Sequence, residues 1–378
     1  MSAQTRKSIN ISLAVFSVLA VIGVVCWILQ LTKGLQMTNL GTTNMWGLYI
    51  TGFMIFTGVA AGSLFFASVP YLFRLDEFKP YCRISAYVGA VSSIVAASLF
   101  IIVDIGNPER VWLFITSGNF TSPMFWDFII LLSYMVISVI FTRQLILVHE
   151  GKKDEKSVKP IAVLAFAAGI LVFVTSFVFS FQTARPMWNT PAQPLSFLLA
   201  AFAVALAVLI ILAFILNKIG YIHMPVPLIS KMAKLCALLL AAELLIIIGE
   251  VLVGLYPGAG GEYEAVSWLV AGGGAIRFWL EMAAVVGALI LLTRQASEKG
   301  GTILFGAIFA FAAVYLIKSN FLQAELFHPL LNYAGPVMYG DGAFYYIPSL
   351  IEIGVSVGIV SLGAFLLVIG LRALKLGE

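Results

Sequence analysis

The chain has 378 residues, of which 61% are hydrophobic and 11% are charged, and its mean hydropathy is +1.03. This composition excludes a soluble globular domain. The net charge of +4 is small and gives no indication of nucleic-acid binding, so no nucleic-acid partner is expected. We therefore expect an all-α integral membrane protein that lies in the lipid bilayer.

Ten apolar runs are long enough to cross a bilayer, which takes roughly 20 residues of α-helix. The connections between them are too short for a separate soluble domain, so residues 1–378 are predicted to form a single polytopic membrane domain. The first run follows Arg6 and Lys7, but it is too long for a signal peptide and no small-residue cleavage site follows it. The predicted spans cover residues 9–31, 48–73, 82–103, 124–148, 160–182, 194–216, 229–255, 266–292, 302–320 and 346–370.

The basic residues predict the orientation of these spans. With ten spans both termini share a side, and most of the 22 Lys and Arg residues fall on that side, so the positive-inside rule places both termini in the cytoplasm. Most tryptophans fall on the opposite, outer side, whereas Trp279 lies within a span. A one-sided belt can be interfacial anchoring alone, or it can mark a surface that holds a partner. The belt consists of Trp27, Trp46, Trp112, Trp126, Trp188 and Trp268.

Neither haem nor a metal is expected in this chain. A b-type cytochrome needs axial ligands, usually histidines, that face each other within the helix bundle, and no histidine lies within a predicted span. The three cysteines lie on three different predicted helices and have no paired spacing, so they indicate neither a metal cluster nor a disulfide framework.

Glycines predict how several helices pack. Gly58 and Gly62 on the second span, and Gly354 and Gly358 on the last one, form small faces that let helix backbones approach closely. The run of residues 272–274 in the eighth span either breaks that helix near its outer end or allows close packing. The sequence favours close packing.

Ionisable groups inside the spans are costly in hydrocarbon and usually functional. Glu243 and Glu250 share one face of the seventh span, about two turns apart, while Arg277 and Glu281 are spaced so that they can pair. Glu352 enters from the outer end of the last span, and Lys318 lies toward the outer end of the ninth. Two interpretations remain open, namely ion pairs that orient the bundle and a water-linked proton path. The proton path is predicted to comprise Glu243, Glu250, Arg277, Glu281 and Glu352.

Aromatic and carboxylate residues gather at the outer ends of the second to fifth spans. Trp46 and Tyr49 open the second span, Asp104 closes the third, Trp126 and Asp127 open the fourth, and Arg185 follows the fifth. Aromatic walls with carboxylates at one depth suit an amphipathic ring whose carbonyl oxygens gain or lose protons. A quinone that enters from the lipid is such a ligand.

These segments resemble the NrfD/PsrC family of respiratory membrane subunits, from about Trp46 to the C-terminus. The likeness rests on W-G-L-Y and F-x-G-x-A-A-G within residues 46–62, D-I-G-N-P-x-R at 104–110, S-P-M-x-W-D at 122–127, and R-P-x-W-N-T-P-x-x-P-L at 185–195. The closing Y-I-P-S-L-I-E-I at 346–353 is similar to the ten-helix branch that includes the hydrogenase subunit HybB.

The resemblance implies two four-helix bundles, residues 48–182 and 194–320, flanked by helices at 9–31 and 346–370. It also implies a quinone pocket near the outer face of the first bundle, in the cytoplasmic membrane of a bacterium or archaeon. A ferredoxin-like iron–sulfur subunit would dock above that pocket, joined to a molybdenum enzyme, a hydrogenase or a multihaem cytochrome. Some members place a histidine in the pocket, but the second span here has none, so Asp104 is the best candidate for binding the quinone.

The leading hypothesis is a haem-free membrane subunit that exchanges electrons between menaquinol or ubiquinol and the iron–sulfur subunit, without pumping protons. Asp104 is predicted to accept the proton and Arg185 to position a quinone oxygen, within a site lined by Trp46, Tyr49, Trp126 and Asp127. The apolar outer loop after Lys318 is predicted to contact the iron–sulfur subunit. Two alternatives remain, a proton-coupled secondary transporter and a passive membrane anchor.

Overall fold

The computed structural model describes residues 3–41, 44–293, 300–326, 346–374 and 376–377, and every element assigned within them is helical. Nine segments of this part of the chain are long and apolar enough to cross a membrane. Eight of them are the single helices α1 (Ala3–Lys33), α2 (Leu48–Leu72), α6 (Pro123–His149), α10 (Gln193–Lys218), α11 (Val226–Leu255), α13 (Ala275–Thr293), α14 (Gly300–Leu326) and α15 (Leu350–Ala373).

The ninth segment consists of consecutive short helices, η5 (Glu155–Ser157), α7 (Val158–Ile170), α8 (Val172–Thr175) and α9 (Phe177–Ser180). A tenth span is divided in a similar way into α3 (Cys82–Ile94), the π-helical η3 (Val95–Phe100) and α4 (Ile101–Asp104). The residues at both junctions of this span keep right-handed helical dihedral angles, so it runs on without a break. The expected all-α membrane fold of about ten spans is confirmed.

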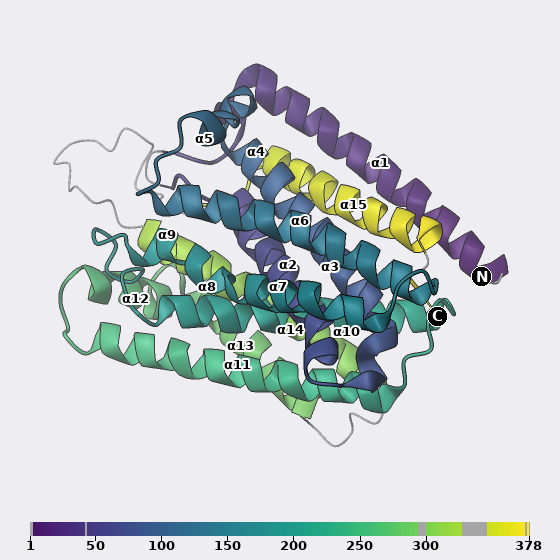
Figure 1. The fold of residues 1–378 in the computed structure, drawn as a ribbon. Helices are drawn as coiled ribbons and strands as arrows, with labels where there is room; N and C mark the ends of the chain where they lie inside the picture. Colours follow the sequence, from purple (N-terminus) through teal and green to yellow (C-terminus); the bar gives the residue numbers. More distant parts are fainter. Residues whose placement is uncertain (1–2, 42–43, 294–299, 327–345, 375, 378) are drawn as a thin grey trace.

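The remaining elements lie at the ends of the spans. They are η1 (Leu35–Met37), η2 (Asp76–Tyr81), η4 (Pro108–Arg110), α5 (Leu113–Thr116) and α12 (Gly261–Ala271). Both termini lie at one end of the assembly of helices (Figure 1), which we call the terminal face. α5, α9 and α12 lie at the opposite end, which we call the far face.

The helices form two rings with a flanking pair. α2 contacts α3 and α7, and α6 contacts the same two helices, which closes the first bundle. α10 contacts α11 and α14, and α13 contacts those two as well, which closes the second bundle. α2 and α10 join the bundles, while α1 packs along α15 at the flank (Figure 1). This is the two-bundle architecture expected from the sequence.

Small residues allow the closest helix contacts, as predicted. A Cβ atom at Gly23 of α1 would lie 2.3 Å from the Cα atom of Gly358 on α15. A Cβ atom at Gly62 of α2 would lie 2.4 Å from the Cβ atom of Ala205 on α10. At both contacts the backbones are too close for a side chain, so glycine is required.

The eighth predicted span is broken, and the expectation of close packing at residues 272–274 was wrong. α12 ends at Ala271 and α13 begins at Ala275. The amide groups of Gly272 and Gly274 both donate to the carbonyl oxygen of Trp268, at 3.1 Å, so the chain turns back toward that residue. A Cβ atom at Gly272 would lie 2.7 Å from the Trp268 backbone, which explains why this turn needs glycine.

Candidate functional site

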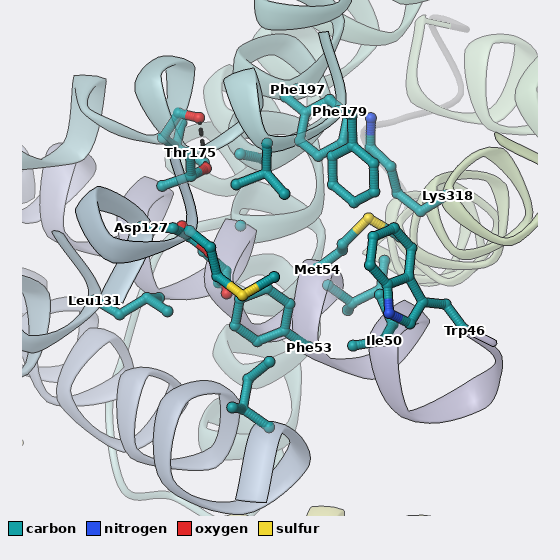
Figure 2. A pocket seen from close by; sticks show the side chains of 18 of the residues that line it. Trp46, Ile50, Phe53, Met54, Asp127, Leu131, Thr175, Phe179, Phe197 and Lys318 are labelled. Atoms are coloured by element: carbon teal, nitrogen blue, oxygen red, sulfur yellow. Dashed lines mark hydrogen bonds between the residues drawn. The ribbon is translucent and has the colours of Figure 1, made fainter. Parts of the chain in front are cut away.

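A cavity of about 160 Å³ lies in the first bundle toward the far face. It is bounded by α2, α4, α5, α6, α8, α9, α10 and α14, and its wall is mostly apolar (Figure 2). Its polar lining comes from five side chains, those of Thr57, Asp104, Asp127, Thr175 and Lys318. An apolar cavity with a few convergent polar groups is the usual form of a small-molecule site.

Two carboxylates in this cavity have an oxygen atom without a partner. Oδ1 of Asp104, at the end of α4, and Oδ1 of Asp127, in the second turn of α6, are buried and accept no hydrogen bond from the described residues. The hydroxyl group of Thr57 on α2 is also buried and has no hydrogen-bond partner among the described residues. Since buried polar atoms in folded proteins nearly always have a partner, these atoms indicate a site for a ligand or water with hydrogen-bonding groups.

Contacts with the second bundle hold the aromatic wall of the cavity in place. The ring of Trp46 stacks on Trp188, with centroids 5.9 Å apart and planes inclined by 18°. The indole N–H of Trp188 donates to the carbonyl oxygen of Phe321 on α14 at 2.8 Å. Trp188 is 2% exposed whereas Trp112 is 56% exposed, so the tryptophans of the far face divide into an internal wall and outward-facing residues.

Three residues that the sequence assigned to the quinone site do not line this cavity. Tyr49 faces α1, where its hydroxyl group donates to Oε1 of Gln30 at 2.6 Å. Trp126 is 49% exposed, because it lies about 100° around α6 from the inward-facing Asp127. Arg185 donates instead to the carbonyl oxygen of Glu325. Trp46, Asp104 and Asp127 are therefore the predicted site residues that the fold brings together.

A second polar cluster lies in the second bundle around a cavity of about 40 Å³. Glu243 accepts from the hydroxyl of Ser196 at 2.6 Å, Glu250 from the amide of Gln193 at 2.9 Å, and Glu281 from the amide of Asn320 at 2.7 Å. Each carboxylate thus has its own neutral donor. The fold brings together three of the five residues that were predicted to form a proton path.

Lys318 lies at the centre of this cluster, although the sequence did not assign it to the site. Its side chain is 4% exposed, and it interacts electrostatically with all three carboxylates. The Lys318 ammonium group donates to the hydroxyl oxygen of Ser196 at 3.4 Å and lies 3.8 Å from the centre of the Phe197 ring. Lys318 also lines the first cavity (Figure 2) and is the only described residue that lines both.

The two other predicted proton-path residues have structural partners elsewhere. Arg277 donates to the carbonyl oxygen of Tyr346 at 2.9 Å, so Arg277 and Glu281 have separate partners and the expected pair is not formed. Glu352 accepts from the Tyr346 hydroxyl group and, at 2.8 Å, from the backbone amide of Ser349 in a capping box that begins α15. Glu352 is therefore a helix-capping residue. The predicted docking loop after Lys318 lies largely outside the described residues.

Comparisons with known proteins identify a family and several similar proteins. A model of the family described as polysulphide reductase, NrfD, matches residues 36–324. The chain is similar to a putative dimethyl sulfoxide reductase membrane subunit of Halobacterium salinarum, with 27% identity over 96% of this chain and 91% of that protein. It is 25% identical to a selenate reductase subunit of Mesobacillus selenatarsenatis, over 92% of this chain and 90% of the relative.

A third relative is similar over a shorter region. It is the Hdr-like menaquinol oxidoreductase integral membrane subunit of Archaeoglobus fulgidus, which is 27% identical over 52% of this chain and 48% of that protein. All three relatives are thus named as subunits of reductases or oxidoreductases. Because the family model covers more than half of the chain, the chain belongs to the polysulphide reductase NrfD family.

Proposed function

We propose that this chain is the quinone-interacting membrane subunit of a respiratory oxidoreductase complex, and that the first-bundle cavity binds the quinone ring. The observation that carries the proposal is the pair of unpartnered oxygens, Asp104 Oδ1 and Asp127 Oδ1, in an otherwise apolar cavity. A quinone ring has carbonyl or hydroxyl oxygens on opposite sides of an apolar body, which matches carboxyl groups from two different helices. The name of the menaquinol oxidoreductase relative agrees with this ligand class.

The residues of the cavity would each have a distinct role. Trp46, Phe179 and Phe197 would hold the ring by stacking and exclude water. The carboxyl groups of Asp104 and Asp127 would orient the ring oxygens and exchange protons with them. Bound menaquinone or ubiquinone supplies a carrier of two electrons and two protons, so this chain needs no haem or metal of its own.

Electrons would pass to or from an iron–sulfur subunit docked at the far face. A molybdenum enzyme, a hydrogenase or a multihaem cytochrome would complete the chain of electron transfer. In this proposal the terminal face lies in the cytoplasm and the far face outside, as the distribution of Lys and Arg predicts. The chain would then lie in the cytoplasmic membrane of a bacterium or archaeon.

The second-bundle cluster would offer protons a route toward the far face. Lys318 lines both cavities, and Glu250 lies about two turns nearer the far face than Glu243. Glu262 of α12 interacts electrostatically with Glu250 and is only partly buried. The alternative to a proton route on the terminal side is therefore a path from the cavity by way of Lys318 and Glu250 to the outer surface.

The test replaces Asp104 with asparagine in the assembled complex. Asp104→Asn keeps the size of the side chain but removes its proton exchange, so quinone-dependent turnover should fall by roughly a hundredfold or more. Asp76→Asn, at the exposed start of η2, is the matched control and should retain full turnover. A passive anchor predicts normal turnover in both variants, and a proton-coupled transporter predicts that the parent chain shows no quinone dependence.

A further inference from the structure

One face of α6 carries a line of buried hydroxyl groups below the cavity. Asp127 is followed on the same face by Tyr134, Ser138 and Thr142, at intervals of seven, four and four residues. Tyr134 and Ser138 are 0% exposed and Thr142 is 4% exposed. The hydroxyl oxygens of all three are buried without a hydrogen-bond partner among the described residues. Serine and threonine hydroxyls inside a helix usually donate to a carbonyl one turn earlier, so their orientation needs another explanation.

The neighbouring helices continue this polar line. Ser138 Oγ lies where α3 and α2 meet α6, because a Cβ atom at Gly89 of α3 would be 3.4 Å from it and 3.3 Å from the carbonyl oxygen of Ala60. On α2, the hydroxyl groups of Thr57 and Ser63 are also buried without a partner in the described part of the chain. Thr57 itself lines the cavity. Unpartnered hydroxyls of two helices, Thr57 on α2 and the line on α6, thus lie in or next to the first bundle's cavity.

The spacing of these groups suits a chain of water molecules. With a rise of 1.5 Å per residue, Asp127 and Thr142 are roughly 22 Å apart along α6, and Ser138 lies roughly 6 Å from Thr142. One water that hydrogen-bonds to two hydroxyls spans about that interval. Helical side chains point toward the helix N-terminus, which directs the phenol of Tyr134 toward Asp127. This shortens the step from Asp127 to Tyr134 and lengthens the step from Tyr134 to Ser138, which then takes more than one water.

We propose that the Tyr134–Ser138–Thr142 hydroxyl line of α6 is a proton route between the cavity and the terminal face. This inference rests on the proposed quinone site. Reduction of one quinone takes two electrons from the partner iron–sulfur subunit and two protons along the α6 line to Asp127. Oxidation of the quinol returns two electrons to that subunit and two protons along the same line. The quinone reaction is therefore coupled to proton exchange at the terminal face, in contrast to the non-pumping chemistry expected from the sequence.

The test measures the side on which protons are exchanged. The whole complex is reconstituted into vesicles with a pH-sensitive dye in the lumen and quinone in the membrane. A membrane-impermeant electron donor or acceptor is added outside, so that only complexes with the far face outward turn over. The dye then reports protons exchanged at the terminal face. The parent complex should exchange about one lumenal proton per electron, as the two-proton, two-electron chemistry requires.

Three variants remove single hydroxyl groups at nearly constant volume, namely Tyr134→Phe, Ser138→Ala and Thr142→Val. Each should slow lumenal proton exchange by roughly tenfold or more, while a quinone analogue still quenches tryptophan fluorescence with the parent affinity. Ser133→Ala is the matched control on the same helix, because the Ser133 hydroxyl already donates to the carbonyl of Ile129 at 2.8 Å. This control should exchange protons at the parent rate.

The outcomes separate this inference from the proposed function. If the parent complex neither binds the analogue nor turns over with quinone, the proposed function fails. If it binds and turns over but the lumenal pH stays constant, protons use the far face and the α6 route is overturned. If the lumenal pH changes equally in the parent and in all three variants, the hydroxyl line carries no protons and the inference is also overturned.

Discussion

The two bundles differ in whether their buried carboxylates have hydrogen-bond partners. In the second bundle each of the carboxylates of Glu243, Glu250 and Glu281 accepts a hydrogen bond from a neighbouring side chain, and all three interact electrostatically with Lys318. In the first bundle the Oδ1 atoms of Asp104 and Asp127 have no partner in the described structure and face a cavity of about 160 Å³. A side-chain donor for every carboxylate suits an internal network, whereas unpartnered atoms around an apolar space suit a ligand.

The contrast is strong but not absolute. Two oxygens of this cluster, Glu243 Oε2 and Gln193 Oε1, are also buried without a partner among the described residues. Both residues line the cavity of about 40 Å³, which has room for water molecules but not for a quinone ring. The size of the space next to the unpartnered atom therefore distinguishes a water site from a candidate ligand site.

The largest expected effect follows from removal of the one cation in the second-bundle cluster. Lys318→Met should destabilise the folded chain by about 3–5 kcal/mol, because buried carboxylates lose their charge partner. Thermal unfolding of the purified complex measures this change. The double variant Lys318→Met with Glu243→Gln should recover part of the loss. A melting temperature equal to that of the parent would show that the cluster is uncharged.

A smaller loss is expected when one neutral donor is removed from the same cluster. Ser196→Ala deletes the hydroxyl group that donates to Glu243 at 2.6 Å. The expected cost is about 1–3 kcal/mol, since a buried acceptor is left without its partner. Ser133→Ala on α6, which removes a hydroxyl bonded within its own helix, should cost less in the same unfolding measurement. Equal effects of the two variants would contradict the partnered network.

The smallest effect on stability is expected in the first bundle. Asp127→Asn alters a carboxylate whose Oδ1 atom has no partner among the described residues, so the free energy of unfolding should change by less than about 1 kcal/mol. Quinone-dependent turnover should nevertheless fall. A stability loss as large as that of Ser196→Ala would mean that Asp127 is a structural residue, and the contrast between the bundles would fail.

The fold followed from the sequence because it depends on long apolar runs and on glycine faces. These are local patterns, and the Gly23–Gly358 and Gly62–Ala205 contacts formed where small residues recur. The site was only partly predictable. Asp127 and Trp126 are adjacent in sequence, and only the helix rotation decides which one faces the cavity. Lys318 was visible as a single charge in an apolar run, but its carboxylate partners lie on other helices.

Two residues that the sequence assigned to functional sites have partners in connecting segments of the structure. Glu352 and Arg185 are charged and near the membrane, so the sequence predicted a proton path through Glu352 and a quinone contact for Arg185. In the structure both form hydrogen bonds that hold connecting segments. Sequence spacing does not show whether a charged group meets a backbone atom far along the chain. The α6 hydroxyl line could not be predicted from the sequence for a related reason. Tyr134, Ser138 and Thr142 are common residue types in a helix, and only the structure shows that their hydroxyl groups have no partner within the described residues.

Photolabelling with an azidoquinone tests the central claim most directly. The intact complex is illuminated with the probe, digested, and analysed by mass spectrometry. The label should appear on cavity residues of α2 and α6, such as Ile50, Met54 and Leu131, and excess unlabelled quinone should prevent it. Labelling confined to outward-facing residues such as Leu132 or Val136, unchanged by excess quinone, would contradict a quinone site in the first bundle.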